Sequence, residues 1–180
     1  MLAFGHDKLR IVSDALDVAE DVTGNFYKLS SGQWRRHPYD VKTLASLRGD
    51  EIFPHAFAVL SKGRMAAGGV TGKASQRDCY FICLQDDRIL SAVHRDKEIR
   101  LFPLLVYVLT HELVHIVRFS SFARRFEASD ETREDEESIV HTTTHDILRR
   151  LPIPNLGHVL ELYRDHRNHR ICRVMGDLWS

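Results

Sequence analysis

Apolar side chains recur every three or four residues in three segments of the chain, which is the spacing of a helix with one buried face. The first segment spans residues 7–22 and stops at Gly24. The second spans residues 99–119 and is apolar nearly all round, so we expect a helix buried in the core. The third spans residues 133–151, and its apolar face carries Val140, Ile147, Leu148 and Leu151.

The middle of the chain has the composition of strands instead. Residues 55–60, 79–84 and 89–93 are short runs rich in apolar and β-branched or aromatic residues, bounded by turn residues. A glycine-rich stretch at 66–73 separates the first two runs and predicts a hairpin turn. These features predict a small antiparallel or mixed sheet.

The order of these elements indicates an α+β fold with a mainly helical C-terminal half. We expect one domain over residues 1–180, with a helix-and-sheet lobe over about 1–97 and a helical lobe over about 98–180. A further short helix is expected at 41–47.

The second helix contains the motif His-Glu-x-x-His within the sequence THELVHIVRF, residues 110–119. Four residues advance a helix by about one turn, so His111 and His115 share a face and can bind one metal ion. Glu112 lies about 100° round the helix, where it can take a proton from a metal-bound water. The motif has only three fixed positions and occurs by chance in unrelated helices. Its place in a buried helix strengthens the metal interpretation, because buried polar groups need partners and a metal ion satisfies all three. A hydrogen-bonded cluster of polar side chains in the core is the alternative.

A third metal ligand is expected from the helix at 133–151. Glu137 falls within its apolar sector, where a lone carboxylate is costly unless it binds something, and His141 lies one turn further on. Glu137 is therefore the preferred ligand, and His141 either joins the metal ligands or supports one of them. Glu134 and Glu136 are the alternatives to Glu137.

Together the two helices resemble the gluzincin metallopeptidases, the thermolysin-like group, in which HExxH is followed by a helix bearing Glu-x-x-x-Asp. The corresponding residues here read Glu137-Ser-Ile-Val-His141, with a histidine in place of the family's acid. The resemblance covers about thirty-five residues. It implies one zinc ion per chain bound by His111, His115 and Glu137, with Glu112 activating water and His141 supporting a ligand histidine.

The resemblance implies two further features. An edge strand before the HExxH helix would pair with an extended peptide substrate, and residues 79–84 or 89–93 could supply it. A histidine or tyrosine would polarise the scissile carbonyl. His145, His158 and Tyr163 are available, and His145 is preferred because it lies one turn beyond His141.

Two other kinds of protein fit parts of the same pattern. Glu112-x-x-His115 also matches the Glu-x-x-His signature of di-iron carboxylate bundles, with Glu137, His141 and His145 completing a second metal site. That class, however, needs a second copy of the signature, and the chain has none. A regulatory module with a catalytically silent metal site is the other alternative, although such a site has no need of Glu112.

The composition of the chain bears on its expected partners and its cellular compartment. The chain has 25 acidic and 25 basic residues, so no overall charge draws it to nucleic acid or to an anionic membrane, and we expect neither as a partner. Its three cysteines, Cys79, Cys83 and Cys172, form no CxxC pair, which favours a reducing compartment. The N-terminus lacks an apolar leader, and the longest apolar run, 101–109, is about half a membrane span. The expected protein is a cytoplasmic zinc peptidase acting on a peptide or protein, with its oligomeric state open.

Overall fold

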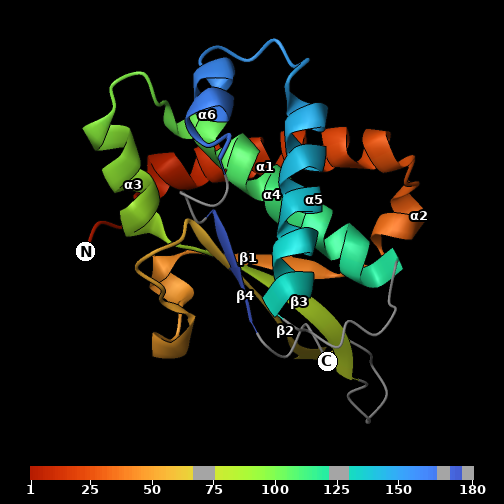
Figure 1. The fold of residues 1–180 in the computed structure, drawn as a ribbon. Coiled ribbons are helices and arrows are strands. Elements are labelled where there is room, and N and C mark those ends of the chain that lie inside the picture. Colours follow the sequence, from red (N-terminus) through yellow and green to blue (C-terminus); the bar gives the residue numbers. More distant parts are fainter. Residues whose placement is uncertain (67–75, 122–129, 166–170, 176–180) are drawn as a thin grey trace.

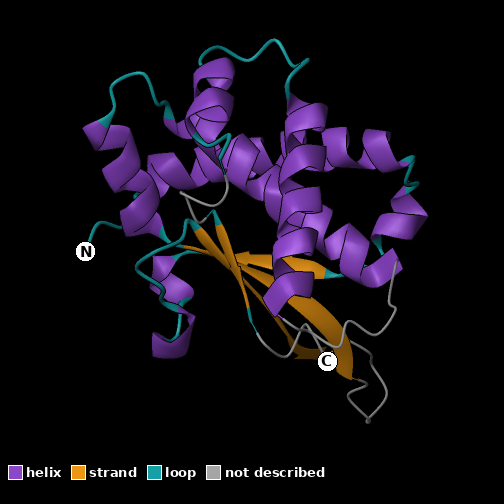
Figure 2. Ribbon diagram, viewed as in Figure 1, coloured by secondary structure: helices purple, strands orange, loops and turns teal. Residues whose placement is uncertain are grey.

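The structure, a computed structural model, packs a set of helices over one side of a four-stranded mixed sheet (Figures 1 and 2). It describes residues 1–66, 76–121, 130–165 and 171–175. The helices are α1 (His6–Tyr27), α2 (Ser31–Trp34), α3 (Asp86–Arg95), α4 (Leu101–Ser121), α5 (Asp130–Leu148) and α6 (Leu156–Leu162), with short 3-10 turns η1 (Leu44–Ser46) and η2 (Gly49–Glu51). The strands are β1 (Tyr39–Lys42), β2 (Ala58–Ala66), β3 (Gln76–Leu84) and β4 (Cys172–Val174). The predicted α+β class, with a small mixed sheet and a mostly helical C-terminal half, is confirmed.

The sheet has the strand order β1-β3-β2-β4. β2 and β3 form an antiparallel pair whose register runs from Ala58 opposite Leu84 to Ala66 opposite Gln76. β1 is parallel to β3, and β4 is parallel to β2, so these two short strands form the edges. The hairpin turn expected at 66–73 lies, apart from Ala66, outside the described residues.

Several local predictions were wrong. Helix α1 does not stop at Gly24 but continues to Tyr27. Residues 89–93, expected to be a strand, belong to helix α3, because acidic residues in its first turn and basic residues in its last complement the helix dipole. Residues 41–47, expected to be a short helix, divide between strand β1 and the turn η1. Parallel pairing with β3 decides the conformation of β1, and such a pairing leaves no signal in four residues of sequence.

The lobe expected to be helical over about 98–180 also contains a strand, since residues 172–174 form the edge strand β4. The Ile171 carbonyl accepts hydrogen bonds from Phe57 and Ala58, and the Met175 N–H donates to the Leu60 carbonyl. The end of the chain is thereby joined to the sheet formed by its first half.

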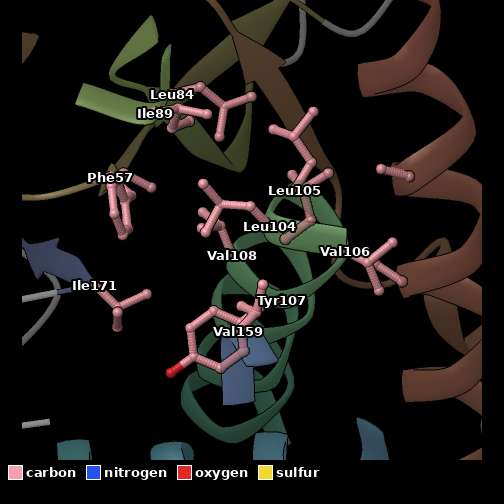
Figure 3. Close-up of a cluster of buried hydrophobic side chains, with 14 of the residues drawn as sticks. Phe57, Leu84, Ile89, Leu104, Leu105, Val106, Tyr107, Val108, Val159 and Ile171 are labelled. Carbon is pink, nitrogen blue, oxygen red and sulfur yellow. The ribbon is translucent and has the colours of Figure 1, made fainter. Parts of the chain in front are cut away.

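The helix α4 lies at the centre of the molecule, where α1, α3, α5, α6 and three strands contact it. Figure 3 shows the side chains of its first turns, among them Leu104, Leu105 and Val108, meeting side chains from near β2, β3, α3 and β4. By length and composition α4 could also cross a bilayer, a property that core helices share, and here it is mostly buried inside the fold. Its burial confirms the helix predicted at 99–119.

Candidate metal centre

His111 and His115 lie one helical turn apart on α4, and neither side chain is exposed to solvent. Their ring centroids are 5.0 Å apart, with an angle of 74° between the ring planes. The HExxH spacing thus produces the paired imidazoles that it predicts.

Glu137, on the facing helix α5, completes the group. One carboxylate oxygen lies 3.0 Å from His111 Nε2 and the other lies 3.0 Å from His115 Nε2. The potential ligand atoms of these three residues all lie within 4.8 Å of one another, and they are the one such group among the residues that the structure describes. The Glu137 side chain is 27% exposed, so the group opens towards solvent on the α5 side.

An ion pair beside this group fixes the position of α5 relative to α4. The Arg118 guanidinium donates two hydrogen bonds to the carboxylate of Glu136, at 2.6 and 2.8 Å. Glu136, which was an alternative ligand, is 2% exposed and faces Arg118, whereas Glu134 is exposed. Arg118 lies seven residues after His111, which puts it on nearly the same face of α4, but its pairing with Glu136 was not predicted from the sequence.

Glu112 is fully buried and contacts a residue that the sequence analysis did not consider for the site. The Cys172 thiol, on β4, donates a hydrogen bond to one Glu112 oxygen at 2.9 Å. The other oxygen, Oε1, is buried without a hydrogen-bond partner among the described residues. Burial raises the pKa of Glu112 to about 7, although His111 and Cys172 act in the opposite direction. The carboxyl group therefore sits close to the balance between its charged and neutral forms at neutral pH.

His141 is not part of the ligand group. Its Nε2 lies 2.7 Å from the Arg164 carbonyl, which can only accept, so Nε2 carries the hydrogen. Nδ1 of the same ring lies 3.3 Å from the Tyr107 hydroxyl and forms a hydrogen bond with it. The Tyr107 ring also lies 6.5 Å from the His111 ring, centroid to centroid, so Tyr107 lies between His141 and His111.

The three residues expected to polarise a substrate carbonyl lie in different places. His145 is eight residues beyond Glu137, about 12 Å further along α5, so the structure does not bring it to the group. His158 pairs with Asp96 at 2.9 Å and with Glu98 at 3.3 Å. Tyr163 stacks on Tyr107, with ring centroids 6.0 Å apart, and so contacts a neighbour of His111.

The edge strand beside the site is β4. Of the strands expected to pair with substrate, β3 lies inside the sheet between β1 and β2, and residues 89–93 are helical, so neither forms an edge. β4 has β2 as its neighbour and carries Cys172, which contacts Glu112. The end of the chain therefore supplies the sheet edge that the sequence analysis sought before α4.

The electrostatics of the group suit a cation. Burial by itself would raise the pKa of Glu137, but His111 and His115 hold it well below its usual range, so the carboxylate is charged. His111 Nε2, although 3.0 Å from a Glu137 oxygen, has no hydrogen-bond partner among the described residues. A bound metal ion would take the lone pair of this nitrogen and that of His115 Nε2 in place of these contacts with Glu137.

The chain was compared with known proteins in three ways. No family model, curated protein or solved structure matches it. The likeness to gluzincins therefore rests on the residues of α4 and α5 alone.

Proposed function

We propose that the protein is a zinc-dependent hydrolase that cleaves peptide bonds. One observation carries the proposal: the two oxygens of Glu137 each lie 3.0 Å from the Nε2 atom of a different HExxH histidine, inside an otherwise buried site. Three residues from two helices thus converge on one point, and Glu112 is adjacent in sequence to one of them.

The three residues fit a zinc ion. Two imidazoles and one carboxylate are a common catalytic zinc set, which leaves a fourth position for water or substrate. Tetrahedral bonds of about 2.0–2.1 Å separate donor atoms by about 3.3 Å, close to the 3.0 Å between Glu137 and each histidine. The same three side chains can also bind iron, cobalt or nickel, and zinc is the preferred metal among these.

The proposed reaction divides the work between the metal and Glu112. A bound zinc ion would supply Lewis acidity, polarising the scissile carbonyl and making water a better nucleophile. Glu112 accepts the proton of the attacking water through Oε1, the oxygen that has no partner, and returns it to the leaving amine. Burial supports the second step, because it raises the pKa of Glu112 and so favours a carboxyl group that holds the proton until the leaving amine takes it.

The sheet edge favours a peptide as the substrate. An extended chain adds readily to an edge strand through main-chain hydrogen bonds, and β4 is an edge strand next to Glu112.

Two rival functions receive less support. A di-iron centre needs a second group of ligands, and both ring nitrogens of His141 are engaged elsewhere, by Tyr107 and Arg164. A silent metal-binding module has no use for a buried carboxylate at position 112, whose burial costs free energy.

The metal content per chain tests the proposal. We expect about one zinc per chain in untagged wild-type protein, measured by plasma mass spectrometry, and a large loss of zinc in Glu137→Ala. Glu134→Ala removes an exposed glutamate from the same helix and should keep the metal. Two irons per chain would support the di-iron reading, and wild-type protein that takes up no zinc would end the hydrolase proposal.

A further inference from the structure

The contact between Cys172 and Glu112 joins two parts of the chain that are sixty residues apart. Both side chains are buried: Glu112 is 0% exposed and Cys172 is 9% exposed. Cys172 is the first residue of β4 and is held in register opposite Ala58 of β2. The sheet therefore delivers a thiol directly to the carboxylate on α4.

The two oxygens of Glu112 have different surroundings. Oε2 accepts the thiol hydrogen at 2.9 Å, whereas Oε1 is buried and has no partner among the described residues. A general base needs one oxygen that is free to take a proton, and it works best when the carboxylate cannot rotate away. A donor on Oε2 keeps the carboxylate from rotating, and it leaves Oε1 free to take the proton.

Other roles for Cys172 agree less well with the geometry. It is outside the group formed by His111, His115 and Glu137, so it is not placed as a fourth ligand. Burial, together with the nearby Glu112 and Glu137 carboxylates, raises the pKa of its thiol well above the usual range. The thiol therefore keeps its hydrogen, which makes it a donor and a poor nucleophile.

We propose that Cys172 is a positioning residue: its thiol holds one oxygen of Glu112 and thereby directs the other oxygen towards the metal centre. This inference rests on the proposed function, because it assigns Glu112 the role of base. It adds that the reaction depends on a side chain from the last strand of the sheet, outside the two helices that carry the motif.

Binding of acetohydroxamic acid to the zinc-loaded protein tests the inference without a known substrate. The acid would bind zinc as its anion, and if Glu112 is the base its carboxylate would take up the proton that the acid releases. Calorimetric titration therefore reports how well Glu112 is placed. The zinc content of each variant is measured in parallel, so effects on the metal are seen separately.

The informative variants are Cys172→Val, which keeps a compact side chain in a strand but removes the donor, and Cys172→Ser, which keeps a donor. Cys83→Ala is the matched control, since Cys83 is a fully buried cysteine on β3. We expect Cys172→Val to keep its zinc but to bind acetohydroxamic acid about 10-fold more weakly, because Glu112 is no longer held in the orientation that takes up the proton of the acid. The affinity of Cys172→Ser for the acid should lie within about 3-fold of the wild-type affinity, and the affinity of Cys83→Ala should equal that of wild type.

The same variants separate turnover from substrate binding once a fluorogenic peptide is found. A positioning role lowers kcat and leaves KM nearly unchanged, whereas damage to the sheet would alter both. Melting curves by circular dichroism show whether Cys172→Val is folded. If it is not, Cys172→Ala replaces it as the variant without a donor and is compared with Cys172→Ser.

Two results would overturn the inference and leave the proposed function in place. One is wild-type affinity for acetohydroxamic acid in Cys172→Val, and the other is loss of zinc from that variant, which would place Cys172 in support of the ligands. Wild-type protein that binds no zinc would instead defeat the proposed function, and this inference with it.

Discussion

At the scale of single residues, burial alone does not identify a metal ligand. Glu136 and Glu137 are neighbours on α5, and Glu136 is the more buried of the two. Arg118 satisfies Glu136, whereas the carboxylate of Glu137 faces two histidines. Both acids obey the rule that a buried charge needs a partner, and the identity of that partner separates a structural role from a metal-binding one.

Replacing Glu112 by Gln tests its role as base. The amide has nearly the same shape but cannot accept a proton, so we expect zinc content to stay at the wild-type level while peptide turnover falls by about 10²–10⁴-fold. The measurement is hydrolysis of a fluorogenic peptide pool by zinc-loaded protein, with Glu134→Gln as the control. Normal cleavage by Glu112→Gln would show that another group activates the water.

Much of the candidate centre could be predicted from the sequence, residue by residue. The helical spacing of His111 and His115 and the apolar sector that contains Glu137 were enough to place all three in one group. Cys172 could not be found in this way, because its contact with Glu112 depends on the pairing of β4 with β2. Neither the β2 residues nor the β4 residues of that pair carry a local sequence pattern that indicates their pairing.

At the scale of elements, the site depends on how α5 is held against α4. Glu136 precedes Glu137 in the chain, so its ion pair with Arg118 limits both the distance and the rotation of α5 at Glu137. Near it, the His115 ring stacks on Phe119 at 5.5 Å, which limits the orientations open to that imidazole.

Removing the cation of this pair should loosen the helix interface. We expect Arg118→Met to lower the free energy of unfolding by roughly 3 kcal/mol, because the carboxylate of Glu136 is left buried and unpaired. The double variant Arg118→Met with Glu136→Leu should recover most of that loss, since both charges are gone. Urea unfolding curves measure both values, and an Arg118→Met protein as stable as wild type would exclude this role for the pair.

Element boundaries were predicted less well than element types. The long helices α1, α4 and α5 were predicted because each buries a face along many turns. The strands β1 and β4 were missed because four and three residues carry too little periodicity, and their parallel partners lie far away in sequence. The residues of α3 alternate well enough to suggest a strand, but charges at both ends favour a helix.

At the scale of the whole molecule, a bound metal would connect parts of the fold that otherwise meet only by packing. Zinc bound by His111, His115 and Glu137 would link α4 to α5, and the contact of Glu112 with Cys172 extends this connection to the sheet. A ligand that binds only the folded state stabilises it in proportion to its affinity.

Metal removal should therefore lower the melting temperature. With free zinc at about 100 times Kd, binding adds about 2.7 kcal/mol, which corresponds to roughly 5–11 °C for a chain of this size. We expect a chelator to remove that increment from wild-type protein and to leave Glu137→Ala unchanged, as measured by calorimetry. A melting temperature that responds to neither zinc nor chelator would contradict a site that spans α4 and α5.

The sequence by itself determined the α+β class, the buried central helix and the three residues that form the candidate centre. Helical periodicity carries that information, because residues three and four positions apart share a face wherever the helix is placed. Only the tertiary structure decided that β4 is the sheet edge at the site, that Arg118 neutralises Glu136, and that Cys172 contacts Glu112. Each of these depends on contacts between distant segments, which form when the chain buries its apolar surface and then has to satisfy the polar groups that are buried with it.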